Sequence, residues 1–212
     1  MSLIAGRYQP LDTARAGVPQ RARDLQTAQT VVLRDLPLPN DGGDVALARA
    51  DAAKRIFHPS LVTLFDVVPL ADHRVLLAYE FVPAQSVALV SGGQPFNARR
   101  AAEIVTEIAD AVAELHARGI VHGSISQNTV LITLKGKAKL DRLGDPSLHT
   151  LVEPRIEADF VALTDLLVEL AGKPSGAGLT GMQAIQALVA RVRSGKLESV
   201  ATFAAMLRRV GE

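Results

Sequence analysis

Short runs of apolar and β-branched residues in the N-terminal third of the chain predict strands. The run Thr30–Leu36 has the composition of a buried strand, and the proline, asparagine and glycine residues after it predict a loop. Leu61–Val68 and Arg74–Val82 are two further strand-like runs, separated by a proline and an aspartate. We expect these two runs to form an antiparallel pair with a tight connection.

One helix is predicted between these strands. Asp44 is its expected N-cap, and the helix should end at His58–Pro59 because the residue before a proline avoids the α region. The apolar positions that recur there at roughly helical spacing are Val45, Ala48, Ala52 and Ile56. This part of the chain therefore reads as strands around a single helix.

The rest of the chain is mainly helical in pattern. Asn97 should cap a long helix that runs to Arg118 and carries one apolar stripe. Two short strands around Lys135-Gly136 are expected to form a hairpin. The further predicted helices are Asp159–Ala171, Gly181–Arg193 and Ser199–Arg209. The pattern indicates an α+β fold, with a strand-rich region over residues 1–82 and a helical region over residues 83–212.

Composition narrows the function classes. The chain has 212 residues, 23 Lys and Arg against 22 Asp and Glu, and no cysteine. The near-zero net charge argues against a dedicated nucleic-acid binder, and the lack of cysteine excludes disulfides, thiol nucleophiles and cysteine-ligated metals. No apolar run approaches a membrane span, and no secretory signal is visible. We expect a cytoplasmic protein, either whole or a domain of a longer chain.

Several short motifs follow one another in a recognisable order. They are Gly6-Arg7-Tyr8, DLQTAQTVVLR over residues 24–34, HPSLV over 58–62, LAYEFV over 77–82, LHARGIVH over 115–122 and DFVALTDLLVELAG over 159–172. Together they resemble a bacterial Ser/Thr protein kinase domain of the eukaryotic-like type. The resemblance implies a bilobal fold, with a small strand-rich N-lobe containing one main helix and a reduced, mainly helical C-lobe.

The resemblance also assigns positions to the charged residues that phosphoryl transfer needs. The lysine of the third strand falls on Arg34, whose guanidinium differs in geometry from an ammonium. The glutamate of the following helix falls near Arg49. A cation there would repel Arg34 instead of pairing with it.

The positions of the catalytic loop are substituted as well. The catalytic aspartate corresponds to Ser124, the loop lysine to Ser126 and the metal-binding asparagine to Thr129. The second metal-binding aspartate corresponds to Arg142, so that a cation replaces the main magnesium ligand. Asp141 lies one residue early, and in an extended strand it should point to the opposite face.

The expected nucleotide site is degraded in the same way. Of the phosphate-loop glycines only Gly17 remains, and Tyr79 falls on the gatekeeper position behind the adenine pocket. If any nucleotide binds, the resemblance assigns it to Gly17, Tyr79 and the two arginines Arg34 and Arg142. We expect no Mg–ATP cofactor, because Arg142 places a positive charge where the metal should lie and Thr129 offers only one neutral oxygen. We also expect no separate metal site, because the histidines lack partners at ligand spacing.

Other family positions keep residues suited to a structural role. His122 and Leu143 occupy positions that stack into the packed spine of kinases, and Gly144 is retained. Asp159 matches the aspartate that accepts backbone hydrogen bonds from the catalytic loop. The alternative for His122, a general base or ligand, is weaker than a core histidine.

Two hypotheses follow. The first is a pseudokinase, a kinase fold that transfers no phosphate and acts as a protein-binding or regulatory module. The second is a nucleotide sensor or atypical phosphotransferase that uses Arg34 and Arg142 without metal. Expected partners are another protein, another domain of a longer parent chain, or a second copy of this chain. Fold resemblance alone licenses no activity.

Overall fold

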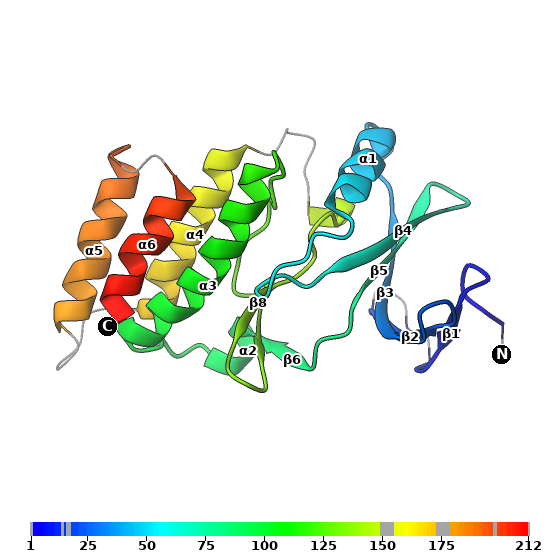
Figure 1. Cartoon of the computed structure of the whole chain (residues 1–212), viewed down its shortest axis with the longest axis horizontal. Coiled ribbons are helices and arrows are strands. Elements are labelled where there is room, and N and C mark those ends of the chain that lie inside the picture. The colour runs from blue at the N-terminus through cyan, green and yellow to red at the C-terminus, as the bar shows by residue number, and fades with distance from the viewer. Residues whose placement is uncertain are drawn as a thin grey trace. The chain divides into compact units, whose positions relative to one another are not determined.

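The computed structural model describes residues 2–13, 15, 18–148, 155–172, 179–196 and 199–211 (Figure 1). The chain divides into two compact units. The sheet unit comprises Met1–His58, Val62–Val82 and Arg142–Glu153, and the helical unit comprises Pro59–Leu61, Pro83–Asp141 and Pro154–Glu212. The main boundary between the units thus lies after Val82. Two short segments are exceptions: residues 59–61 belong to the helical unit, and residues 142–153 belong to the sheet unit.

The sheet unit is built on one five-stranded antiparallel sheet of order β1-β2-β3-β5-β4. Its strands are β1 (Tyr8–Pro10), β2 (Gln20–Asp24), β3 (Thr30–Pro37), β4 (Leu64–Leu70) and β5 (Arg74–Glu80). Successive side chains of a strand point to opposite faces, so Val31 and Leu33 lie on the same face of β3. They join a buried cluster with Tyr8, Ala22, Leu76 and Ala78. The strands predicted over 30–36, 61–68 and 74–82 are confirmed, with shifted ends.

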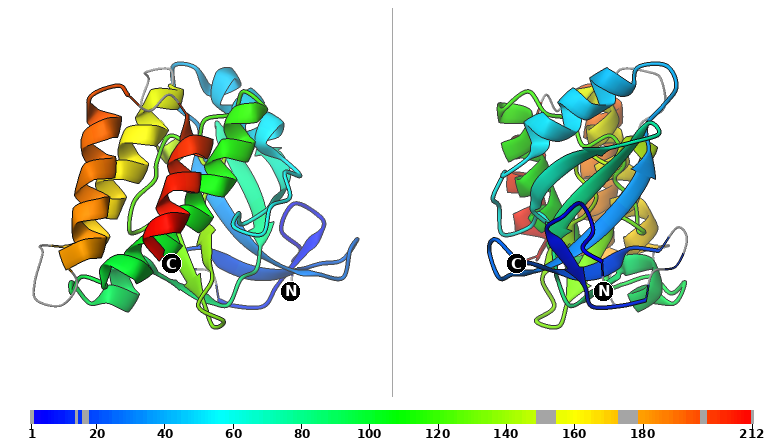
Figure 2. Two further views of the ribbon diagram at one scale, coloured as in Figure 1. Left: turned by 60° about the vertical axis from the view of Figure 1, so that its left-hand side comes forward. Right: turned by 90° about the vertical axis from the view of Figure 1, so that its right-hand side faces the viewer.

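Helix α1 (Gly43–Ala53) lies beside the strands of this sheet, as Figure 2 shows. The prediction of Asp44 as its N-cap is wrong. Gly42 holds that position with a φ of 79°, and Asp44 lies in the first turn of the helix. Glycine adopts this left-handed conformation at little cost, which explains why the helix begins after Gly42.

The predicted apolar face of α1 is also wrong. Val45, Ala48 and Ala52 are exposed, and the buried residues are Gly43, Ala50 and Ala53. The helix ends at Ala53, well before His58, so the buried Ile56 lies beyond it. Alanine-rich helices carry little periodic signal, and here tertiary contacts with small residues decide which face is buried.

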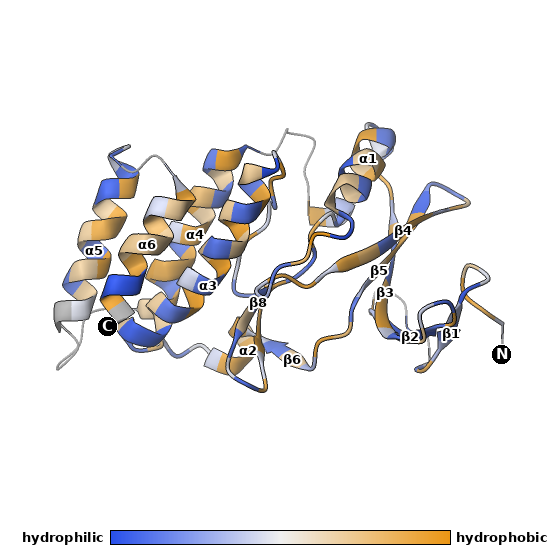
Figure 3. Ribbon diagram, viewed as in Figure 1, coloured by the Kyte–Doolittle hydropathy of each residue, from blue (hydrophilic) through white to orange (hydrophobic). Residues whose placement is uncertain are grey.

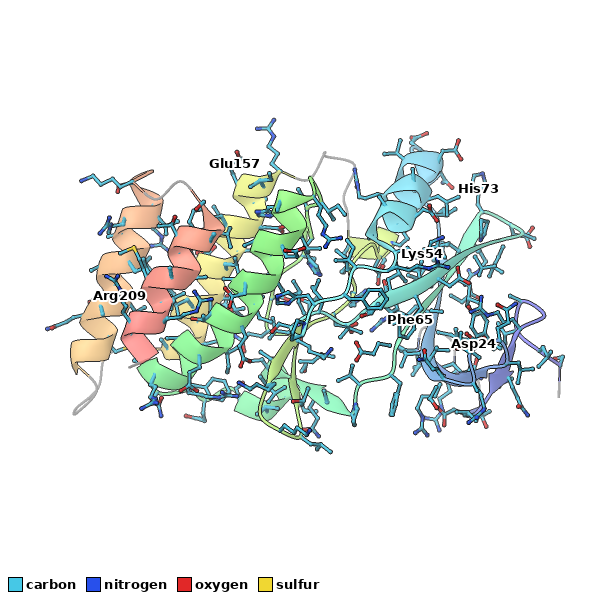
Figure 4. All side chains as sticks on the ribbon, viewed as in Figure 1. Asp24, Lys54, Phe65, His73, Glu157 and Arg209 are labelled. Atoms are coloured by element: carbon cyan, nitrogen blue, oxygen red, sulfur yellow. The ribbon has the colours of Figure 1, made fainter. Side chains whose placement is uncertain are left out.

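A charged cluster anchors the first strand of the sheet unit. Arg7 donates two hydrogen bonds of 2.7 Å to the carboxylate of Asp24 and one of 2.6 Å to Asp66. Asp24 also accepts from the Thr27 hydroxyl at 2.7 Å. The Tyr8 hydroxyl donates to Asp66 at 3.2 Å, and burial, together with the Asp66 charge, raises the pKa of Tyr8 to about 12. Asp24 lies among the N-terminal strands in Figure 4.

The helical unit packs its long helices together. They are α3 (Ala98–Ala117), α4 (Ile156–Ala171), α5 (Leu179–Arg193) and α6 (Val200–Gly211). Figure 3 shows hydrophobic and hydrophilic stretches following one another along them. The side-chain oxygen of Asn97 accepts from the Arg100 amide at 2.8 Å, as a capping residue does. The rings of Phe160 and Phe203 meet edge to face across α4 and α6 at 5.5 Å. The predicted long helices are confirmed.

A small sheet completes the helical unit. It has the order β6-β7-β8, formed by β6 (Ala84–Ser86), β7 (Val130–Thr133) and β8 (Ala138–Leu140), and the short helix α2 (Val87–Ser91) follows β6. The β7–β8 hairpin was predicted, whereas β6 and α2 are too short to show a period in sequence. Within the described ranges, no helix has the length and apolar character to cross a membrane.

We predict that Arg7→Gln destabilises the protein by about 2–3 kcal/mol, because it leaves Asp24 buried without its cation. The hydrogen bonds from Arg7 hold the pKa of Asp24 well below its usual range, so the carboxylate is charged at neutral pH. Urea unfolding of the full chain measures the change. Arg74→Gln, which breaks an exposed pair with Asp35, is the matched control and should cost less than about 0.5 kcal/mol. Equal effects of the two variants would contradict the prediction.

Candidate functional site

Ser124, Ser126 and Thr129 are held together by one buried hydroxyl. Thr129 is 2% exposed, and its Oγ1 donates to the carbonyl of Ser124 at 2.8 Å and accepts from the Ser126 amide at 2.9 Å. The Ser126 carbonyl in turn accepts from the backbone of Thr129 and Val130. Ser124, Ser126 and Thr129 therefore form one compact turn before β7. The Thr129 hydroxyl is used in shaping this turn.

His122 bridges the same loop to the end of β8. Its ring is fully buried, with Nε2 2.9 Å from the carbonyl of Asp141 and Nδ1 3.3 Å from the Ser124 amide. A carbonyl can only accept and an amide can only donate, so these partners fit a neutral ring with its proton on Nε2. The two ring nitrogens thus join residues 122–124 to Asp141.

Asp159, in the first turn of α4, binds backbone amides of this loop. Its carboxylate is 1% exposed and accepts from the amides of His122 and Gly123, both at 2.8 Å. His116 Nε2 lies 3.0 Å from the same carboxylate. Burial alone would raise the pKa of Asp159, but the hydrogen bonds from His116, Gly123 and His122 outweigh it and lower that pKa. His116 was missed as a partner of Asp159, although it lies within the LHARGIVH motif.

The motif Arg142-Leu143-Gly144 lies in the sheet unit and contains a second ion pair. Arg142 Nε donates to Asp145 Oδ2 at 2.9 Å, and Nη2 donates to the Ser147 hydroxyl at 3.0 Å. Asp145 is fully buried and also accepts from the Ser147 amide and hydroxyl. The sequence analysis did not identify Asp145, because this residue lies just outside the Arg142-Leu143-Gly144 motif. The one sequence signal for it is an acidic residue three positions after Arg142.

Leu143 and Gly144 pack this segment against the rest of the sheet unit. The Tyr79 hydroxyl donates to the Leu143 carbonyl at 3.0 Å, and both side chains are about 1% exposed. Gly144 has a φ of 78°, and a Cβ built there would lie 3.1 Å from the Cα of Ala50. Glycine is therefore needed at 144 both for the backbone conformation and for the close approach to α1.

The remaining predicted positions lie elsewhere. Arg34 lies on β3 opposite Leu77 of β5 and is half-buried, as is Arg49 on α1. Gly17 lies outside the described residues, as does the stretch 149–154 that follows Leu148. In the part of the chain that the structure describes, no three His, Asp or Glu side chains gather in a way that could hold a metal ion.

Comparison with known proteins points to one family. The family model described as protein tyrosine and serine/threonine kinase matches residues 22–158, more than half of the chain. The chain is 29% identical over 117 residues to Serine/threonine-protein kinase pkn3 of Myxococcus xanthus, and 30% identical over 132 residues to Cell division control protein 2 homolog 3 of Trypanosoma brucei brucei. It is 26% identical over 188 residues to Cyclin-dependent kinase 4 of Ovis aries.

These matches cover 53%, 60% and 79% of this chain, respectively. They cover 21%, 42% and 59% of the three relatives, so the chain spans less than two thirds of the length of each.

We predict that Asp159→Asn destabilises the protein by about 2–4 kcal/mol, because an amide nitrogen would face backbone donors in a buried site. Since the folded pKa is lowered, the carboxylate stabilises the fold above its unfolded pKa of about 4, and this contribution is lost as the pH falls through the folded value. The variant should therefore show a flatter loss of stability in acid. Chemical unfolding between pH 7 and pH 3 measures both effects.

Asp165→Asn is the control for this prediction, because Asp165 lies on the same helix with its side chain 53% exposed. It should change stability by less than about 0.5 kcal/mol. An Asp159 variant that unfolds like the parent would show that the carboxylate does not hold the loop.

Proposed function

The chain belongs to the protein tyrosine and serine/threonine kinase family, and on this basis we propose that it is a pseudokinase, which transfers no phosphate and acts by binding another protein. Kinases of this fold rely on a lysine, a glutamate, a catalytic aspartate and two residues that hold magnesium. At those five positions this chain has Arg34, Arg49, Ser124, Thr129 and Arg142. Catalysis of this reaction is almost entirely positioning and charge stabilisation, so the loss of these groups removes its basis.

The observation that carries the proposal is the ion pair of Arg142. A guanidinium occupies the position of the main magnesium ligand, and it is bound to the buried carboxylate of Asp145 at 2.9 Å. Magnesium takes oxygen ligands, and a fixed cation beside it would repel it. The residues at this position do not fit a metal–nucleotide complex.

The catalytic loop supports the same conclusion. Ser124 has no group that accepts a proton at neutral pH, in contrast to the carboxylate of active relatives. The Thr129 hydroxyl already donates to one carbonyl and accepts from one amide of its own turn. The loop therefore keeps its conformation through Asp159 and Thr129, while the chemical groups of the reaction are replaced.

The alternative is a nucleotide or polyphosphate site built from Arg34 and Arg142 without metal. The presence of two arginines at family phosphate and metal positions favours it. Against it, the Nε and Nη2 groups of Arg142 already bind Asp145 and Ser147, so a phosphate would compete with Asp145 for the same positive charge. Losing that cation would leave the Asp145 carboxylate buried without a counter-ion, which is costly. We therefore favour the pseudokinase.

We further propose that the partner is another protein or another domain of a longer parent chain, in the cytoplasm. The chain spans only part of its curated relatives, which suits a module that works beside other domains. Both units expose large apolar side chains: Phe57 is 67% exposed in the sheet unit, and Leu134 is 89% exposed in the helical unit. A second copy of the chain is a further candidate partner, which light scattering at high concentration would reveal.

We predict that the chain incorporates no phosphate from radiolabelled ATP, either into itself or into generic protein substrates, with magnesium or with manganese. An active bacterial Ser/Thr kinase domain in the same assay is the control for the reagents. Incorporation above background that is abolished in Arg34→Ala or Arg142→Ala would refute the proposal, because these residues would then take part in the reaction.

A second prediction separates the two hypotheses. For a pseudokinase without a nucleotide site, ATP should not raise the melting temperature, whether magnesium or EDTA is present. For the metal-free site, ATP should raise it equally in EDTA and in magnesium, and Arg142→Gln should abolish the shift. A shift that requires magnesium would contradict both hypotheses, because neither provides a metal ligand at residue 142.

A further inference from the structure

We infer that the Arg142–Asp145 ion pair is a conformational lock, which holds residues 142–148 in one position against helix α1. The inference concerns the sheet unit alone and does not depend on whether the protein transfers phosphate. Residues 142–148 include the short 3₁₀ helix Pro146–Leu148, which contacts both α1 and β3. We call this stretch the Arg142 segment.

The first part of the lock is electrostatic. Asp145 has no exposed surface, and a buried carboxylate needs a counter-ion as well as hydrogen bonds. The counter-ion that the structure gives it is Arg142, three residues earlier, whose side chain is 24% exposed. The Ser147 amide and hydroxyl satisfy the other oxygen at 2.9 and 2.5 Å. Arg142 also reaches the Ser147 hydroxyl, so the three side chains close one network.

The second part is steric. In addition to its contact with the Cα of Ala50, a Cβ built on Gly144 would lie 3.3 Å from the side chains of Ala53 and Leu64. The backbone of the Arg142 segment is thus in direct contact with the small-residue face of α1. The Tyr79 hydroxyl fixes the Leu143 carbonyl from the sheet side at 3.0 Å. Any movement of the Arg142 segment must therefore disturb the contact with α1.

The backbone of Arg142 adopts a conformation that is unfavourable for an arginine. Its φ is 70°, in the left-handed region that residues other than glycine, asparagine and aspartate seldom adopt. This conformation turns the chain back so that Arg142 and Asp145 meet, and the amide of Asp145 bonds to the Arg142 carbonyl at 3.1 Å. A strained residue persists only where its surroundings hold it, and here the ion pair supplies that restraint.

Hydrogen–deuterium exchange on the full chain tests the lock. In Arg142→Gln, amides of the Arg142 segment and of α1 should exchange at least about tenfold faster than in the parent, while amides of α3 in the helical unit keep their parental rate. The double variant Arg142→Gln with Asp145→Asn should exchange more slowly than Arg142→Gln alone, because it no longer buries an uncompensated charge. This ordering distinguishes an ion-pair lock from simple loss of a large side chain.

Two further variants keep the test decisive if Arg142→Gln does not fold. Arg142→Asn relieves the backbone strain but removes the cation, so faster exchange in this variant shows that the ion pair outweighs the strain. Arg142→Lys keeps the charge and should lie between the parent and Arg142→Asn.

Arg193→Gln is the matched control, since it breaks an exposed arginine–aspartate pair in the helical unit, and it should leave the Arg142 segment and α1 unchanged. Parental exchange rates in both Arg142→Asn and Asp145→Asn would overturn the inference.

Discussion

The geometry of the loop after α3, in the helical unit, depends on the hydrogen bonds that its backbone donates to the buried carboxylate of Asp159. Two adjacent backbone amides, those of His122 and Gly123, point at its two oxygens, and His116 approaches one of them. Backbone donors that are buried need partners, and a charged acceptor binds them more strongly than a neutral one. One side chain of α4 thereby fixes the start of the loop after α3. His122 then bonds to the Asp141 carbonyl, and the Thr129 carbonyl accepts from the Asp141 amide just before β7.

Buried carboxylates have the same organising role in the sheet unit. Asp24 is held by Arg7 at the edge of the sheet, and Asp145 is held by Arg142 beside α1. In both cases the acid is almost fully buried and the arginine remains partly exposed. This arrangement lets a long cation neutralise an interior charge while its own end keeps some contact with water. Each of these ion pairs therefore fixes a loop or strand end of the sheet unit through one buried acid.

The sequence allowed much of the fold to be predicted, for physical reasons that differ between elements. Helix α3 has a full apolar stripe and a capping asparagine, so its period and its start were both readable. Helix α1 was expected, but its N-cap, its end and its buried face were wrong. Alanine and glycine fit either face, and contacts with the Arg142 segment and β4 decide which face is buried.

The candidate site was predictable to a different extent. The resemblance assigned positions to Ser124, Thr129 and Arg142 because the motifs keep their order; these assignments stay a prediction. The partners of those residues could not be predicted. Asp145 meets Arg142 only because Arg142 adopts a left-handed conformation, and the local sequence gives no sign of it. His116 and Asp159 are likewise far apart in sequence, and only the fold brings the Asp159 carboxylate to both His116 and the amides of the loop.

The pairing of Arg142 with Asp145 also constrains how this sequence can evolve. An aspartate at position 142 would place two carboxylates together around a buried site and remove the cation that Asp145 requires. Replacing Asp145 first would leave Arg142 in a strained conformation without its carboxylate, held only by the Ser147 hydroxyl among the contacts described for it. Neither single step is neutral, so the two positions are epistatic and change most easily together. An acidic residue introduced at position 142 would therefore meet a barrier set by Asp145, three residues away.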